Sequence, residues 1–135
     1  MLRVVADTNI YVSAYNFGGF PGKFLELAQD GQIHLFISAP ILQELERVLR
    51  QKFGWPEERV GRVITNVLRF THLVIPEKRL AVVTDDPTDD RILECALKAQ
   101  ADAIVTGDSH LLKLKTFQGI AILTVSNVLR RFGRN

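Results

Sequence analysis

The sequence predicts an α/β fold, a three-layer α/β/α sandwich with a central, mostly parallel sheet, and three observations support it. Short apolar runs alternate along the chain with longer segments of helical period. Two runs, residues 2–6 and 103–105, are largely apolar without alternation, which is typical of strands covered on both faces. Asp7 and Asp108 follow these runs, and ligands of such sheets bind beyond the carboxyl ends of the strands.

The same alternation places each element in order within one expected domain, residues 1–135. Strands are expected at residues 2–6, 33–37, 72–75, 103–106 and 120–124. Helices are expected at residues 21–30, 39–53, 56–70, 89–100 and 126–132, with a short helical turn at 110–114. Ser38 can cap the second helix, and Pro40 and Pro56 suit first helical turns. Two helices are expected to end at Gly31 and Gly54.

Composition indicates a globular protein of the cytoplasm. Hydrophobic residues make up 47% of the chain and charged residues 24%, as in ordinary globular domains. The apolar stretch before Asp7 is too short for a signal-peptide core or a membrane span, so no membrane partner is expected. The single cysteine, Cys95, suits a reducing compartment and is expected to be a buried apolar residue.

The net charge of +2 is too small for a protein that binds nucleic acid through general basicity. Basic residues nevertheless cluster at positions 47–52, 113–115 and 130–134. Around an acidic site, such clusters would suit a polyanion that is gripped by its backbone and cut at a metal ion. For each cluster alone, a solvated helix face is the favoured interpretation.

Asp7 and Asp108 are candidates for a shared metal site. Either aspartate could simply cap the element that follows it, and Ser109 competes for the second cap. Because both stand at equivalent strand ends, a shared site is favoured. Carboxylates gathered at one sheet edge repel each other and lose hydration, so they persist mainly where a hard divalent cation neutralises them.

A second acidic group opens the predicted helix 89–100. Acidic residues are common in a first helical turn, where they complement the helix dipole. The adjacent Asp89 and Asp90, with Asp85 and Asp86 just before them, exceed what capping requires. Such a segment would repel RNA unless a cation neutralised it.

A further acid comes from the helix after Ser38. With about 3.6 residues per turn, its buried stripe includes Ile41 and Leu45, and the stripe is flanked on opposite sides by Glu44 and Glu46. The helical wheel does not choose between these glutamates. The spacing of Glu46 with Arg50 favours a surface ion pair for Glu46.

The histidines lack the spacing of metal ligands. His34 and His72 are expected to be ordinary strand residues. His110, two positions after Asp108, is a candidate contact of a metal ligand or of the substrate.

In their order, these motifs resemble those of the PIN-domain nucleases, the family that includes the VapC toxins of toxin-antitoxin pairs. Val-Val-Ala-Asp-Thr-Asn-Ile resembles the first motif and contains Asp7. Ile-Leu-Gln-Glu-Leu-Glu resembles the second and assigns the ligand role to Glu44. Asp-Arg-Ile-Leu-Glu-Cys-Ala resembles the third through Asp90, and Val-Thr-Gly-Asp the fourth through Asp108. Because Asp89 directly precedes Asp90, either could be the third ligand.

The resemblance implies an endoribonuclease that depends on Mg²⁺ or Mn²⁺ and is frequently a homodimer. Asp7, Glu44, Asp90 and Asp108 would be its metal ligands and catalytic residues. A metal-bound water would attack an RNA phosphodiester in line and leave a 5′-phosphate. Further candidates for orienting the water, the carboxylates or the substrate are Thr8, Asn9, Asp89, Thr106 and His110. For Thr8, Asn9 and Thr106, the alternative role is to form local hydrogen bonds within a turn.

The resemblance also implies a small antitoxin protein that silences the site. An arginine of the antitoxin would pair with the carboxylates in place of the metal. Its apolar residues would pack beside the groove, around Phe17, Phe20 and Trp55, although a core role is the favoured interpretation for each aromatic. The segment Asp-Asp-Pro-Thr-Asp-Asp and Gly107 resemble a toxin-like branch of the family, so an RNA-processing nuclease without a toxin role is the alternative.

Two other classes compete with this hypothesis. Phosphotransfer domains also gather acids and Mg²⁺ at strand ends, but the phosphatase pattern requires a second aspartate where Asn9 stands. A receiver domain requires an acidic pair near the first strand, whereas the extra acids here come late. A PIN-like module that binds RNA or protein without cutting is the other class, and the presence of all four carboxylates argues against it.

Overall fold

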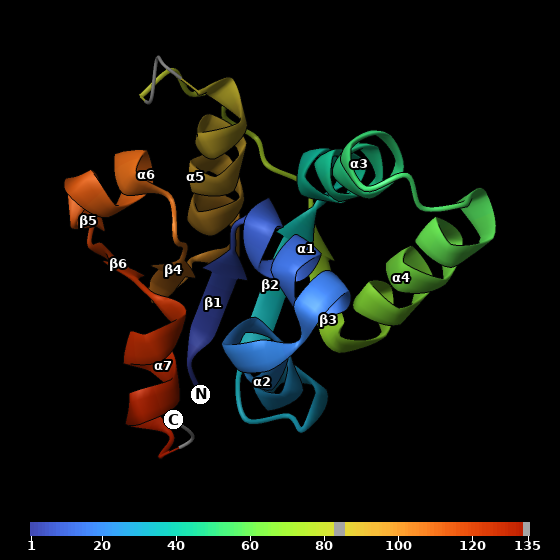
Figure 1. Cartoon of the computed structure of the whole chain (residues 1–135). Helices are drawn as coiled ribbons and strands as arrows, with labels where there is room; N and C mark the ends of the chain where they lie inside the picture. The colour runs from blue at the N-terminus through green and yellow to red at the C-terminus, as the bar shows by residue number, and fades with distance from the viewer. Residues whose placement is uncertain (83–85, 134–135) are drawn as a thin grey trace.

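The protein folds around one mostly parallel sheet in the computed structural model, which describes residues 1–82 and 86–133. The strand order is β3-β2-β1-β4-β6-β5 (Figure 1). The strands are β1 (Arg3–Ala6), β2 (His34–Ser38), β3 (Thr71–Val74), β4 (Ala103–Val105), β5 (Thr116–Phe117) and β6 (Ile120–Leu123). All neighbouring strands are parallel except β5 and β6. The predicted α/β class is therefore confirmed.

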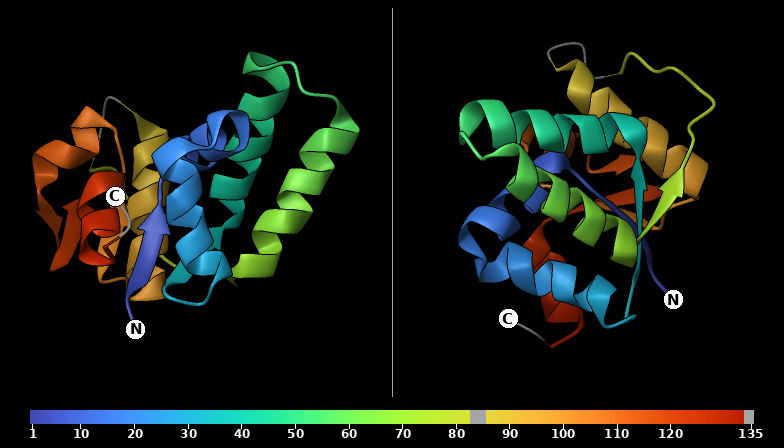
Figure 2. Two further views of the ribbon diagram at one scale, coloured as in Figure 1. Left: turned by 60° about the horizontal axis from the view of Figure 1, so that its bottom comes forward. Right: turned by 90° about the vertical axis from the view of Figure 1, so that its right-hand side faces the viewer.

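Helices cover both faces of this sheet, with α5 on one face and α1, α2 and α7 on the other (Figure 2). Their bounds are α1 (Thr8–Phe17), α2 (Gly19–Gln29), α3 (Ala39–Arg47), α4 (Glu57–Phe70), α5 (Pro87–Ala99), α6 (Ser109–Leu114) and α7 (Val125–Arg131). A π-helical turn, η1 (Val48–Lys52), extends α3. None of the described helices combines the length and the apolar character needed to cross a membrane.

The central strands are buried on both faces, as their continuous apolar runs predict. Val4 and Val5 of β1 and Ile104 of β4 have no exposed surface. The register pairs Ala6 with Val105, the last residues of their strands. Residues that follow β1 and β4 therefore meet at one edge of the sheet.

Some helix boundaries differ from the prediction. A turn or a helix was expected directly after Asp7, and the structure has the helix α1 there; the next helix, α2, begins at Gly19 rather than at residue 21. The predicted helix 39–53 is divided into α3 and η1. Ser38 occupies the N-cap position of α3 without a capping bond from its side chain, so that part of the prediction is wrong. Gly31 and Gly54 end helices in left-handed conformations, as predicted.

Two further differences have local causes. Helix α5 begins at Pro87 because Asp86 caps it, accepting a hydrogen bond from the amide of Thr88 at 3.0 Å. Strand β5 was not predicted because two residues are too few to show a period. It forms a hairpin with β6 through Gln118 and Gly119, whose φ angles of 49° and 82° suit a tight turn.

Two predicted features lie outside the described residues. These are Asp85 of the acidic group and Arg134 of the C-terminal basic cluster.

Cys95 is buried as predicted, and burial raises the pKa of its thiol to about 12.

Candidate active site

Asp7 lies at the junction of β1 and α1 with 4% of its surface exposed. Its backbone N–H donates to the carbonyl oxygen of Val105 at 3.0 Å, which ties it to the end of β4. Its Oδ1 accepts the amide of Asn9 at 2.7 Å and caps α1, while Oδ2 accepts the hydroxyl of Thr106. Burial raises the pKa of Asp7; the hydrogen bonds from Thr106 and Asn9 oppose this shift, and the charge of Asp108 adds to it.

Thr106 joins the two strand-end aspartates. Its side chain is fully buried, and its hydroxyl donates to Asp7 and accepts the backbone N–H of Asp108 at 2.9 Å. Its own amide donates to the carbonyl of Leu123 in β6 at 2.9 Å. This geometry suits the orienting role predicted for Thr106.

Asp108 caps α6 from the end of the loop after β4. Its Oδ1 accepts the amides of His110 and Leu111 at 2.7 and 3.2 Å, and the Nδ1 of His110 lies 3.6 Å from the same oxygen. Candidate ligand atoms of Asp89, Asp108 and His110 lie within 4.8 Å of one another. His110 therefore stands beside the acids, where it was expected.

The start of α5 decides which of the adjacent aspartates faces this site. Asp89 is buried, and burial together with the charges of the surrounding aspartates raises its pKa to about 7. The Oδ1 of Asp90 accepts the amide of Val82 at 2.9 Å. The structure thus brings Asp89, and not Asp90, to Asp7 and Asp108. One residue along a helix is a rotation of about 100°, so neighbouring carboxylates cannot share one direction.

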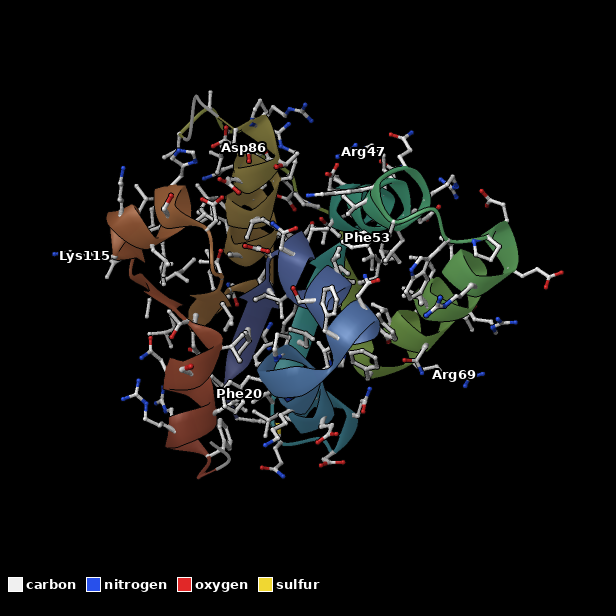
Figure 3. All side chains as sticks on the ribbon, in the orientation of Figure 1. Phe20, Arg47, Phe53, Arg69, Asp86 and Lys115 are labelled. Carbon is white, nitrogen blue, oxygen red and sulfur yellow. The ribbon has the colours of Figure 1, made fainter. Side chains whose placement is uncertain are left out.

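Glu44 reaches the site from α3. Its carboxylate is paired with Arg47, whose Nε donates to Oε2 at 3.1 Å and whose Nη2 donates to Oε1. Glu46 is paired with Arg50 at 3.7 Å, as predicted. The helix therefore presents Glu44 to the sheet edge. Figure 3 shows Arg47 of α3 and Asp86, at the start of α5, at the same edge of the molecule.

These side chains enclose a cavity of about 50 Å³ at the carboxyl ends of β1 and β4. The cavity is lined by Asp7, Thr8, Asn9, Glu44, Asp86, Thr88, Asp89, Ile92 and Asp108. A groove of about 230 Å³ adjoins it, shares Thr8, Glu44 and Thr88, and adds Arg47 and Arg91. An acidic floor is therefore bordered by two guanidinium groups.

Sequence reasoning missed part of this lining. It assigned no role to Thr88 or Arg91, and it treated Asp86 as lying upstream of the helix. An aspartate followed by a proline is a helix-start signal, and Asp86 with Pro87 would have placed the start of α5 correctly. That start turns Asp89 toward the cavity.

The cavity fits a hard divalent cation. Within residues 1–82 and 86–133, the Oδ2 of Asp89 is buried and has no hydrogen-bond partner, although further carboxylates surround it. A buried carboxylate oxygen of this kind is neutralised either by a proton, which the raised pKa of Asp89 favours, or by a nearby positive charge. The donors are carboxylate oxygens, which suit Mg²⁺ or Mn²⁺. Asp7, Asp89 and Asp108 could hold the ion, with Glu44 joining once its pair with Arg47 opens.

The chain belongs to the PIN domain family, whose model matches residues 3–110. The resemblance seen in the four motifs is therefore confirmed. No match is found among curated proteins.

Solved structures with this fold include two VapBC complexes bound to DNA. The structure of VapBC2 from Rickettsia felis, bound to a DNA fragment from its promoter, has a TM-score of 0.66 at 18% identity and covers 91% of this chain and 98% of that chain. VapBC from Salmonella typhimurium, also DNA-bound, has a TM-score of 0.62 at 19% identity, covering 93% and 99%. PAE2754 from Pyrobaculum aerophilum has a TM-score of 0.65 at 14% identity, covering 99% and 91%.

Proposed function

We propose that this protein is a metal-dependent endoribonuclease and the toxin of a toxin-antitoxin pair. The observation that carries the proposal is the convergence of Asp7, Asp89 and Asp108 with Glu44 around the buried Oδ2 of Asp89, to which none of the described residues donates a hydrogen bond. Membership of the PIN domain family supports the nuclease activity, and the likeness to VapBC structures supports the toxin role. We place the activity in the cytoplasm and in a homodimer.

Each residue of the site has a proposed task. Asp7, Asp89 and Asp108 would hold Mg²⁺ or Mn²⁺. Thr106 would keep Asp7 and Asp108 aligned with each other. When bound, the ion would supply Lewis acidity and a nucleophile from water at neutral pH. Guanidinium groups bind phosphates through several hydrogen bonds, so Arg47 at the rim would hold the RNA backbone.

Metal dependence is tested with a short single-stranded RNA. Cleavage is expected with Mg²⁺ or Mn²⁺, should stop when a chelator is added and should leave 5′-phosphate ends. Cleavage that continues in excess chelator would contradict the metal mechanism. RNA binding without any cleavage would favour the non-catalytic module.

Substitutions of Glu44 and of Glu46 form a matched variant and control that test the proposed active site. Both lie on α3 and both pair with arginines, but the cavity is lined by Glu44. Glu44→Gln is expected to lower the cleavage rate by at least about tenfold, and Glu46→Gln is expected to leave it unchanged. Equal losses in the two variants would show that α3 is not positioned as proposed.

The α1–α2 junction offers a surface for the antitoxin. Phe17 and Phe20 are 78% and 50% exposed, so the core role favoured for them from sequence is wrong. Trp55 is 8% exposed and lies under the guanidinium of Arg59, 3.5 Å from the ring centroid, so its core role is confirmed. The antitoxin contact is proposed at these two phenylalanines because both are exposed and lie beside the same turn.

Co-purification from the native host tests whether a small antitoxin protein binds this chain. The Phe17→Ser, Phe20→Ser double variant should lose a co-purifying small protein and keep RNA cleavage. Ile75→Ser is the control, since Ile75 follows β3 and is as exposed as Phe17. If the unaltered chain purifies alone and its expression does not slow growth, an RNA-processing nuclease replaces the toxin.

A further inference from the structure

Two histidines meet near the amino ends of the strands, at the opposite end of the sheet from the acidic cavity. His34 is the first residue of β2, and His72 is the second residue of β3. The Nε2 of His72 lies 3.3 Å from the Nδ1 of His34, and the ring centroids are 5.2 Å apart. The two residues are 38 positions apart in sequence, and the register that pairs Phe36 with His72 brings them together.

We propose that His34 and His72 form a binding site for a transition-metal ion of the Zn²⁺, Ni²⁺ or Cu²⁺ class, separate from the acidic site. Neutral imidazole is a preferred ligand of these ions, whereas Mg²⁺ prefers oxygen. Two nitrogens that bind one tetrahedral Zn²⁺ at about 2.0–2.1 Å are about 3.3–3.4 Å apart. The observed separation of 3.3 Å already matches that value.

Neighbouring side chains support the ring of His72, which in turn contacts the ring of His34. The ring of His72 packs against that of Phe36, with centroids 5.1 Å apart. Phe36 is covered in turn by the guanidinium of Arg3, which donates to the carbonyl of Ala99 at 3.0 and 2.6 Å. This anchoring directs the charge of Arg3 toward a backbone oxygen. Rings that are ordered before binding lose little freedom when an ion binds.

The site is open to the ion. His72 is exposed and His34 half-buried, so water can complete the coordination shell. In the metal-free protein the facing nitrogens share one hydrogen bond. For both facing nitrogens to bind one ion, the donating ring must carry its proton on its other nitrogen, and both rings must turn until their lone pairs point to the ion. The single hydrogen bond would then be replaced by two coordinate bonds.

A bound ion would tie strand β3 to β2. Strand β3 lies at the edge of the sheet and pairs with β2 alone. An ion that binds only the folded protein raises its melting temperature by mass action. Metal binding is therefore expected to stabilise this edge of the sheet.

Calorimetric titration with Ni²⁺ and with Zn²⁺ tests the proposal. Because Asp89, Asp108 and His110 form another candidate cluster, the titrations use an Asp108→Asn, His110→Gln background. In that background we expect one site and a raised melting temperature. Adding His34→Gln or His72→Gln should weaken the site by about tenfold or more, since either change removes one of two protein ligands.

Unchanged Ni²⁺ affinity in both histidine variants would overturn the proposal. If a variant fails to fold, Cu²⁺ added to the unaltered protein gives a second readout by nuclear magnetic resonance. Paramagnetic broadening that begins at residues 34, 36 and 72 supports the site. Broadening confined to Asp89, Asp108 and His110 overturns it. Neither measurement depends on ribonuclease activity, so the proposal can fail while the proposed function stands.

Discussion

Arg47 neutralises Glu44 at the rim of the acidic cavity, and its guanidinium contacts both carboxylate oxygens. A divalent cation that uses Glu44 as a ligand must compete with this guanidinium. Once the cation holds Glu44, the donors of Arg47 become available to a substrate phosphate. Metal binding and RNA binding are therefore expected to favour each other through Arg47.

Arg47→Gln is expected to tighten metal binding by a few-fold, because Glu44 loses a competing partner. The same variant should bind RNA more weakly once metal is present. Calorimetry with Mn²⁺ measures the first effect, and an RNA-binding assay measures the second. Arg50→Gln is the matched control, since Arg50 pairs with Glu46 and Glu57 instead. An unchanged Mn²⁺ affinity in Arg47→Gln would mean that Glu44 does not hold the metal.

Asp89→Asn and Asp90→Asn should differ in kind. Asp89→Asn is expected to abolish metal binding and cleavage, because it removes the buried oxygen that the ion would satisfy. Asp90→Asn should retain metal binding and lower the melting temperature, because Asp90 accepts the amide of Val82. The reverse pattern would return the ligand role to Asp90, as the motif match suggested.

The stability of the metal-free protein should depend on the ionisation of Asp89. Its pKa is about 7 in the folded protein, above the ordinary value of 3.8. A raised pKa favours the folded state while the carboxyl is protonated, so this contribution is complete below the ordinary value and is lost as pH rises through about 7. The difference in melting temperature between Asp89→Asn and the unaltered protein should therefore grow from about pH 4 to about pH 8. Saturating Mg²⁺ should reduce the difference, and a pH-independent difference would contradict the assignment.

Thr106→Val removes the hydroxyl that links Asp7 to Asp108 without changing the size of the side chain much. Because that hydrogen bond lowers the pKa of Asp7, its loss should raise the pKa further. In a plot of cleavage rate against pH, the rise on the acidic side is expected to move to higher pH. The apparent metal affinity at neutral pH is expected to fall. Thr106→Ser, which keeps the hydroxyl, should restore both. A loss of melting temperature without a shift of the pH profile would indicate a purely structural role.

Local patterns in the sequence were enough to predict the sheet and much of the site. Continuous apolar runs predicted β1 and β4, and the aspartates after them, Asp7 and Asp108, do lie together. The pair Glu46 and Arg50 was also predictable, because residues four apart on a helix are neighbours. These features depend on a few consecutive residues, whose period or spacing is visible without knowledge of their surroundings.

Other features were decided by the tertiary structure. Asp89 rather than Asp90 faces the cavity because the position of α5 against the sheet fixes which side of its first turn is enclosed. Phe17 and Phe20 are exposed because no described helix covers the turn between α1 and α2, whereas Trp55 is covered. His34 and His72 meet through the register of two parallel strands. The sequence by itself determines most of the strands and helices, because each shows its period over a few residues. Packing decides which sides of distant segments face each other, and local patterns do not show this.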